Sequence, residues 1–109
     1  LSSAVVAQYR GLTAAGLGNL PAAEAKLREA LALLALRADG AARPDDAEIA
    51  LYAKGAPKGP TPVSPALEAI APHVALLLVR RSLVFTLEAF GETDKAEAER
   101  RLLPEEWRP

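Results

Sequence analysis

Residues 18–31 read GNLPAAEAKLREAL, and we predict the fold outward from this stretch. Gly18, followed by an asparagine, interrupts a helix, because glycine tolerates the left-handed conformation that a helix stop requires. In the helix that follows, the small Ala23 stands between Leu20 and Leu27, at a position where a large apolar side chain would be expected. A turn followed by a small side chain is typical of two helices that cross closely. The stretch therefore predicts a helical hairpin.

A second version of this pattern lies near the far end of the chain. There Gly91 is followed by Thr93, Ala96 and Arg100. The apolar residues of the chain are mostly Ala and Leu, which favour helices, and β-branched residues are few. We therefore predict an all-α fold made of antiparallel helical hairpins, with a Pro/Gly-rich insertion between them.

A length of 109 residues indicates a single α-helical domain, residues 1–109. We divide it into a helical hairpin over 1–38, an insertion with a short helix over 39–64, a second helical hairpin over 65–103 and a tail over 104–109. The insertion is so dense in glycine and proline that only a short helix over about 45–54 fits, followed by an extended connection over 55–64. Pro72 lies too deep in the helix that begins at the Ser-Pro pair before it, so we expect a kink or a break there. In the tail, Trp107 is expected to lie back on the core.

Charge and hydropathy restrict the classes of partner. The chain has 13 Lys and Arg against 14 Asp and Glu, a formal net charge of −1, so it lacks the positive footprint of a nucleic-acid binder and we expect no direct nucleic-acid contact. No apolar run approaches the roughly 20 residues that span a bilayer, so we expect no membrane partner. The absence of Cys excludes disulfides and thiol catalysis and fits a cytoplasmic location. Because the chain also contains no Met, we expect it to be part of a longer protein.

The residues around the two turns resemble the tetratricopeptide repeat, a helix-turn-helix unit of about 34 residues with small side chains at close crossings. In the first hairpin, five residues fall on the family's positions for small or large side chains: Gly11, Leu20, Ala23, Leu27 and Ala30. Four residues there depart from the pattern: Ala7, Arg10, Ala14 and Ala35. In the second hairpin Leu83, Leu87 and Ala96 agree with it, while Arg100 replaces an expected aromatic residue. A generic helical bundle is the alternative.

The resemblance also implies where a ligand binds. In this family the inner face of the first helix of each hairpin holds the ligand, which implies a partner-binding site at Gln8, Leu12, Leu78, Arg81, Phe85 and Glu88, with Ala15 on the same face. These positions are too apolar for a clamp on a terminal carboxylate, so an amphipathic helix or an apolar peptide is favoured. The alternative interpretation is that Leu12, Leu78 and Phe85 belong to the core. Arg81 interrupts an otherwise apolar helix, so it either needs a buried carboxylate partner or faces a groove.

Residue types that catalyse reactions or bind metals are few in this chain. His73 is the only histidine, and it stands in the first turn of a helix, where we expect it to be merely solvated. The acidic residues at 45, 46 and 48 complement a helix N-terminus. Gly55 and Gly59 lie among prolines, and the Lys-Ser or Lys-Thr pair of a phosphate-binding loop does not follow them. We therefore expect no catalytic residues, no metal site and no cofactor, and a protein that is not an enzyme.

These features favour a protein-interaction module. A partner peptide or helix, or a second copy of the chain, would dock in an apolar helical groove around Leu12, Arg81 and Phe85. Because about three repeats are usually needed to bury such hairpins, two hairpins leave apolar surface uncovered, and we expect a homodimer or part of a longer helical array. The alternative is a regulatory helical domain of a transcription or stress-response protein that contacts DNA only through an attached domain.

Overall fold

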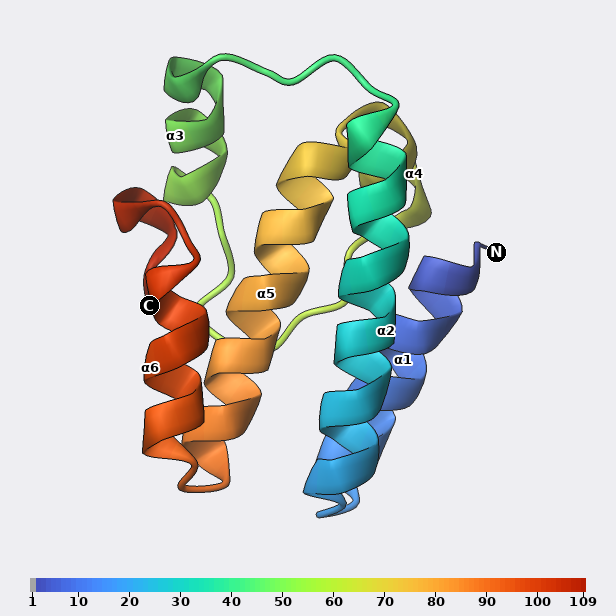
Figure 1. Cartoon of the computed structure of the whole chain (residues 1–109), viewed down its shortest axis with the longest axis vertical. Helices are drawn as coiled ribbons and strands as arrows, with labels where there is room; N and C mark the ends of the chain where they lie inside the picture. Colours follow the sequence, from blue (N-terminus) through green and yellow to red (C-terminus); the bar gives the residue numbers. More distant parts are fainter. Residues whose placement is uncertain (1) are drawn as a thin grey trace.

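Helices account for the regular structure of residues 2–109, which are the residues that the structure, a computed structural model, describes. Their order is α1 (Ser3–Gly16), α2 (Leu20–Asp39), α3 (Asp46–Lys54), α4 (Pro65–Ile70), α5 (Pro72–Ala89) and α6 (Thr93–Arg101), followed by a short 3-10 helix, η1 (Glu105–Trp107) (Figure 1). This described part of the chain contains no strand. The prediction of an all-α fold is confirmed.

The turn between α1 and α2 is built around Gly18. Its φ angle is 79°, in the left-handed region that glycine adopts readily. The Gly18 N–H donates to the carbonyl of Ala15 at 3.0 Å, and the Asn19 N–H donates to that of Ala14 at 2.9 Å. These two bonds form a Schellman motif, which satisfies carbonyl groups that the end of a helix would leave without partners.

The turn between α5 and α6 has the same construction around Gly91. Its φ angle is 80°, and its N–H donates to the carbonyl of Glu88 at 3.0 Å. The Glu92 N–H donates to the carbonyl of Leu87 at 2.9 Å. Both glycines that the sequence marks as turns therefore end one helix and direct the chain back along it.

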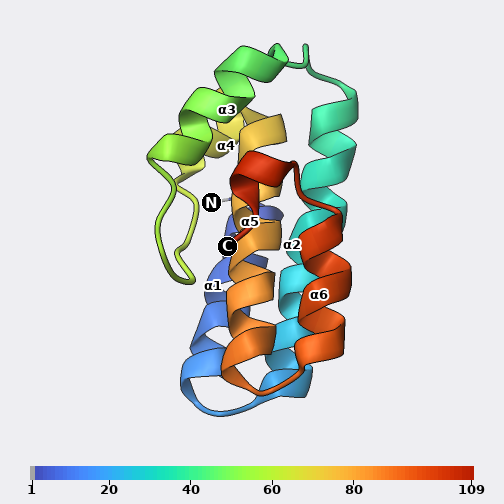
Figure 2. The ribbon, with the colours of Figure 1, turned by 90° about the vertical axis from the view of Figure 1, so that its left-hand side faces the viewer.

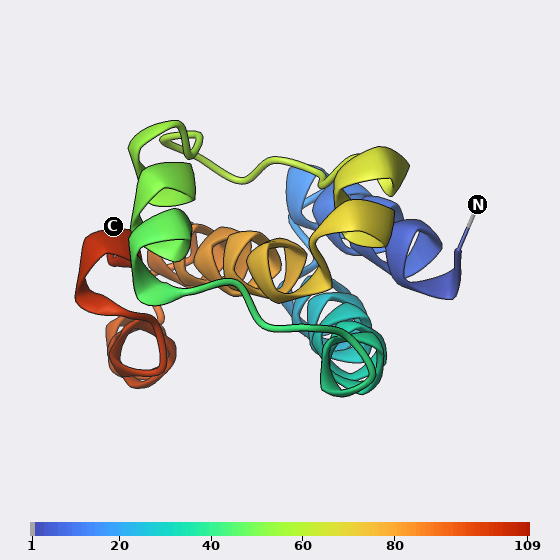
Figure 3. The ribbon, with the colours of Figure 1, turned by 90° about the horizontal axis from the view of Figure 1, so that it is seen from above.

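The helices pack in the order α1, α2, α5 and α6, because α2 contacts both α1 and α5, and α5 contacts α6. Seen from above, α1 and α5 lie between the side formed by α2 and α6 and a third layer formed by α3, the segment after it and α4 (Figure 3). The two small residues that follow the turns, Ala23 and Ala96, are both 0% exposed. The close crossings that they predict are therefore present.

The closest crossing in the first hairpin is at Gly11. A Cβ atom added there would lie 2.9 Å from Cγ of Leu27 and 3.2 Å from its backbone nitrogen, which is closer than such atoms can approach without a shift. The absence of a side chain at Gly11 thus allows Leu27 to pack directly against the backbone of α1. Leu27 itself is buried in the core.

Proline divides the predicted first helix of the second hairpin in two. α4 ends at Ile70, Ala71 leaves the helical conformation with φ −138° and ψ 70°, and Pro72 begins α5. A proline is tolerated in the first turn of a helix, where its missing N–H would have no partner. The expected interruption at Pro72 is therefore a break between two helices.

The last helix ends earlier than the sequence predicts, at Arg101 instead of about 103. The N–H groups of Leu102 and Leu103 bond to carbonyls only three residues back, so the chain tightens there. Pro104 explains this tightening, because a proline disfavours the α-helical conformation of the residue before it.

The tail packs against the insertion through Trp107. The Trp107 side chain is fully buried, and its Nε1 donates to the carbonyl of Ile49 in α3 at 3.1 Å. η1 packs against α3 accordingly, at one end of the helical bundle (Figure 2). Just after the insertion, the carboxylate of Glu68 in α4 is 1% exposed and accepts hydrogen bonds from Ser2 at 2.9 Å and from Arg37 at 2.6 Å. α3 and α4 are each anchored by contacts of their own.

None of the helices described combines the length and the apolar character that crossing a membrane requires.

Candidate functional site

The segment between α3 and α4 crosses the outer side of α1 and α5. We call residues 57–63 of this segment the strap. It runs from α3 to α4 on the side of α1 and α5 that is opposite α2 and α6 (Figure 3). The chain's own backbone therefore lies on part of the inner face that the family resemblance implies as a binding site, where it contacts Gln8 and Arg81.

Two polar side chains hold the strap through its main chain. The Val63 N–H donates to Oε1 of Gln8 in α1 at 2.8 Å. The Thr61 N–H donates to Oγ of Ser82 in α5 at 3.1 Å, and the same hydroxyl lies 3.2 Å from the Thr61 carbonyl, to which it can donate in turn. α1 and α5 thus both contribute a side chain that binds the main chain of the strap.

The spacing of the prolines suits this arrangement. Positions 60 and 62 are prolines, which have no N–H, and both N–H groups that residues 60–63 possess are held by Gln8 or Ser82. Val63 is the strap residue whose side chain reaches the core, with 3% exposure. The face therefore binds an extended main chain and accepts one apolar side chain.

Arg81 in α5 contacts both the strap and the tail. Its Nε donates to the carbonyl of Pro57 at 3.2 Å, and its Nη1 donates to the carbonyl of Trp107 at 2.8 Å. The guanidinium carbon lies 5.4 Å from the centre of the Phe85 ring, a distance suited to a cation–π contact. Within residues 2–109, no carboxylate pairs with it. The expected alternatives for Arg81 are a buried carboxylate partner or a groove, and what the structure shows instead is contact with main-chain carbonyls of the chain itself.

Burial lowers the pKa of the Arg81 guanidinium from its ordinary value. The group still carries its positive charge at neutral pH, because arginine keeps its proton in proteins. Its hydrogen bonds go to neutral carbonyls, so the charge is not neutralised by a neighbour. An anionic group brought to this place would be attracted to it.

The amide of Gln8 is only half used. Gln8 is 1% exposed, and its Oε1 accepts from Val63, but its Nε2 has no hydrogen-bond partner among the residues described. A flipped amide would set an amino group against the Val63 N–H, so the observed orientation is the one that the hydrogen bond requires. The side chain that binds the strap therefore also carries a buried donor without an acceptor.

The remaining predicted site residues do not contact the strap through hydrogen bonds, and they differ in what they contact. Leu12 and Leu78 are half-buried and pack against the core, as the alternative interpretation expects, and Phe85 is half-buried beneath Arg81. Glu88 is exposed and forms an ion pair with Arg100 of α6, away from the strap. The structure brings Gln8 and Arg81 to the strap, and it directs Glu88 elsewhere.

Sequence reasoning did not select Ser82 as a site residue. The only local signal is a hydroxyl within an apolar helix, and its contact with Thr61 spans 21 residues of sequence. Nothing in the sequence shows where the strap runs. We name Gln8, Leu12, Leu78, Arg81, Ser82 and Phe85 together the α1–α5 face.

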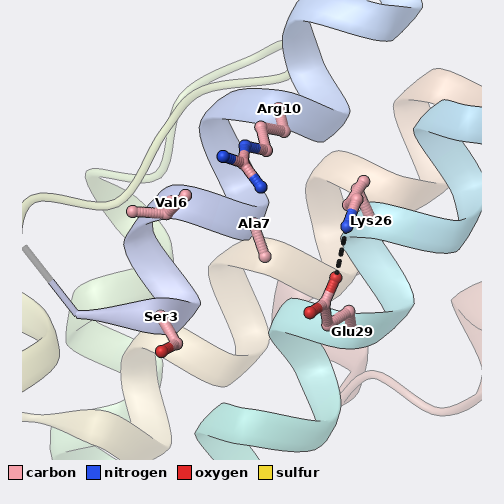
Figure 4. Close-up of a pocket in the computed structure, with 6 residues that line it drawn as sticks. All are labelled: Ser3, Val6, Ala7, Arg10, Lys26 and Glu29. Carbon is pink, nitrogen blue, oxygen red and sulfur yellow. Dashed lines mark hydrogen bonds and ion pairs between the residues drawn. The ribbon is translucent and has the colours of Figure 1, made fainter.

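Two hollows lie away from the α1–α5 face. One, of about 220 Å³, lies between α1 and α2 and is lined by Ser3, Val6, Ala7, Arg10, Lys26 and Glu29 (Figure 4). Lys26 and Glu29 form an ion pair across part of it at 3.0 Å. The other, of about 380 Å³, lies beside α3 against Glu48, Leu51 and Tyr52.

His73 takes part in the loop structure. Its Nε2 lies 3.2 Å from the carbonyl of Ala41, which ties the start of α5 to the loop after α2. Over residues 2–109, His, Asp and Glu side chains do not gather in groups of three or more that would suit a metal ion.

Comparisons with protein families, with curated proteins and with solved structures find no match for this chain.

Proposed function

We propose that this chain is a protein-interaction module that binds a segment of a partner protein on the α1–α5 face. The observation that carries the proposal is Arg81, a positive charge that has no carboxylate partner within residues 2–109 and donates to two main-chain carbonyls. Arginine in such a position is suited to contact with a peptide, because its planar group presents several donors in a fixed geometry. Phe85 beneath it adds apolar surface.

The form of the bound segment follows from the contacts of the strap. Gln8 and Ser82 bind N–H groups two residues apart on an extended chain. A helix about 10–12 Å wide would present its N–H groups to its own carbonyls instead. An extended apolar peptide therefore fits this face better than the amphipathic helix that the sequence left open.

The test is capture of partner proteins by the double variant Arg81→Ala/Phe85→Ala. We expect the proteins retained from native lysate by the immobilised chain to fall at least about tenfold in amount, equivalent to roughly 1.4 kcal/mol of binding. The matched control is Arg101→Ala, which removes an arginine that is 74% exposed on α6. Circular dichroism must show equal helical content in all three proteins. Equal capture by the double variant and the control would refute the assignment.

We also propose that the chain self-associates or continues into a longer helical array. Four large apolar side chains at element ends are mostly exposed: Leu17, Leu36, Ile70 and Leu102. Leu17 is 80% exposed and Ile70 is 79% exposed, which places them in water in the isolated chain. Sedimentation velocity over a range of concentrations tests this, with a rising sedimentation coefficient expected and a constant monomer value counting against it.

A further inference from the structure

We propose that the strap is an intramolecular ligand of the α1–α5 face, and that the partner segment has the same chemistry and displaces it. That segment is an extended peptide with prolines at alternate positions, free N–H groups between them and an aliphatic β-branched side chain at the place of Val63. This inference rests on the proposed function, because it names the class of peptide that the same face binds.

The contacts of the strap are ones that a separate peptide can make. Gln8 and Ser82 bond only to backbone atoms of Val63 and Thr61. Arg81 likewise bonds to a backbone carbonyl, that of Pro57. Since these bonds do not depend on the strap being joined to α3 or α4, a second extended chain can replace it bond for bond.

The strap leaves one donor of the face unused, and this favours a replacement. The amide oxygen of Gln8 accepts from the strap, whereas the amide nitrogen of the same group is buried and has no acceptor among residues 2–109. A buried donor without an acceptor is destabilising. An incoming peptide that gives an N–H to Oε1 and a carbonyl to Nε2 of Gln8 would form two hydrogen bonds with this amide. The strap forms only the bond to Oε1.

The strap can leave the face while the helices stay in place. α3 is held by the bond from Trp107 to Ile49, and α4 by the contacts of the buried Glu68. Most strap residues are exposed or half-exposed, and Val63 is the one whose side chain enters the core. Release therefore exposes one aliphatic side chain and frees the polar groups that a partner requires.

The direct experiment uses a synthetic peptide of residues 56–64 and two forms of the full chain. One form is unchanged, and in the other residues 57–63 are replaced by glycine and serine, so that the face is open. We expect the open form to bind the peptide at least about tenfold more tightly than the unchanged chain, by fluorescence anisotropy of the labelled peptide. The same peptide with a methyl group on the amide nitrogen of Val63 cannot donate to Gln8, and we expect it to lose this binding.

A folded open form, judged by circular dichroism, that does not bind the peptide overturns the inference. Equal binding of the N-methylated peptide also overturns it, because the bond to Gln8 would then not matter.

Proteolysis of the unchanged chain gives a second measurement that needs no altered strap. Lys58 is exposed, and the bond after it becomes more accessible to trypsin when the contacts of Pro57, Thr61 and Val63 with the face are released. Cutting after Lys26 in α2 reports unfolding of the hairpin. We expect saturating peptide, with its own lysine replaced by norleucine, to accelerate cleavage after Lys58 severalfold and to leave cleavage after Lys26 unchanged. No acceleration after Lys58 contradicts displacement.

The two proposals can fail separately. Loss of partner capture in Arg81→Ala/Phe85→Ala with no binding of the strap peptide supports the module and overturns the strap as its ligand. Binding of the strap peptide to the open form, with capture unchanged in the double variant, shows that the face binds its own strap and refutes its use for partners.

Discussion

The two hairpins have the same turn and differ in the contacts that join their helices. In each, a glycine with a positive φ angle closes the same pair of backbone bonds, and a fully buried alanine follows it by five residues. In the first hairpin Leu27 packs against the bare backbone of Gly11. In the second, the residue at the place of Leu27 is Arg100, which pairs with Glu88 and Glu97.

This difference shows that two features of a hairpin have separate causes. The glycine at the turn allows the chain to reverse, and the side chain at the crossing determines how closely the two helices approach. Apolar contact at a crossing removes surface from water and stabilises by area, whereas exposed ion pairs are screened by water and salt. We therefore expect the first hairpin to depend on packing and the second to depend on it less.

The largest effect is expected from replacing Leu27 by Ala. Leu27 is 1% exposed, and deleting a buried leucine side chain destabilises proteins by about 2–5 kcal/mol. Arg100→Ala, at the equivalent place in the second hairpin, should lower the free energy of unfolding by at most about 1 kcal/mol, because its partners are 40% and 46% exposed. Urea denaturation of both variants measures the difference. Equal losses would show that the two crossings are energetically alike.

A smaller effect is expected at Gly11, with Gly16 as its control. Alanine favours a helix over glycine by about 1 kcal/mol, so Gly16→Ala, with open space around its Cβ, should be neutral or slightly stabilising. Gly11→Ala gains the same preference but places a methyl group against Leu27, and overpacking of this kind costs about 1–3 kcal/mol. We expect thermal unfolding to show a lower midpoint for Gly11→Ala than for Gly16→Ala. A higher midpoint for Gly11→Ala would mean that the crossing can widen freely.

The two turns should respond equally when their glycines are replaced. Gly18 and Gly91 have φ angles of 79° and 80°, and an L-residue in this conformation costs roughly 1–2 kcal/mol. Neither glycine has an atom within 4 Å of an added Cβ, so the loss is a backbone effect alone. Gly18→Ala and Gly91→Ala should therefore lower the free energy of unfolding by similar amounts in urea titrations. Clearly different losses of unfolding free energy would contradict this expectation and would show that the two turns differ energetically in spite of their equal geometry.

Features that depend on neighbours in sequence could be predicted. The turn glycines, the break at Pro72 and the short helix after Asp45 all follow from local conformational preferences, and the structure contains each of them. Asp45 caps α3 by accepting from the Glu48 N–H at 2.9 Å. Such signals operate within four or five residues, where propensity and capping decide the outcome.

Features that depend on distant segments could not be predicted. Glu68 meets Arg37 across 31 residues, and Glu99 meets Arg28 across 71 residues, although both carboxylates look like solvated helix charges in the sequence. The course of the strap is of the same kind. The family resemblance implied that Gln8 and Arg81 share one face, but it did not show that both contact the strap. Glu88 shares the helical spacing of that face, but its carboxylate is drawn to Arg100. Periodicity predicts which residues of one helix share a face, and it does not show what lies on that face.

The smallest effect concerns the ion pairs that connect the two hairpins. Glu24 in α2 lies 3.1 Å from Lys95 in α6 and 2.9 Å from Arg28. Burial raises the pKa of the Glu24 carboxyl, but hydrogen bonds from Lys95 and Arg28 outweigh it and hold the pKa below its ordinary value of 4.5. The charged carboxylate is therefore favoured in the folded state, so its stabilising contribution is complete above about pH 4.5 and is lost as the pH falls through the lowered pKa.

We accordingly expect Glu24→Gln to lower the free energy of unfolding by at most about 1 kcal/mol at pH 7, and by less in 1 M salt. The difference from the unchanged chain should disappear in acid, below the lowered pKa of Glu24, when both proteins are compared by urea denaturation. Glu29→Gln is the control, because Glu29 pairs with Lys26 inside α2 and connects no other helix. A difference that persists in acid would mean that the effect of Glu24→Gln does not come from the charge of the carboxylate, and the ion pairs from Glu24 to Lys95 and Arg28 would then not explain its contribution to stability.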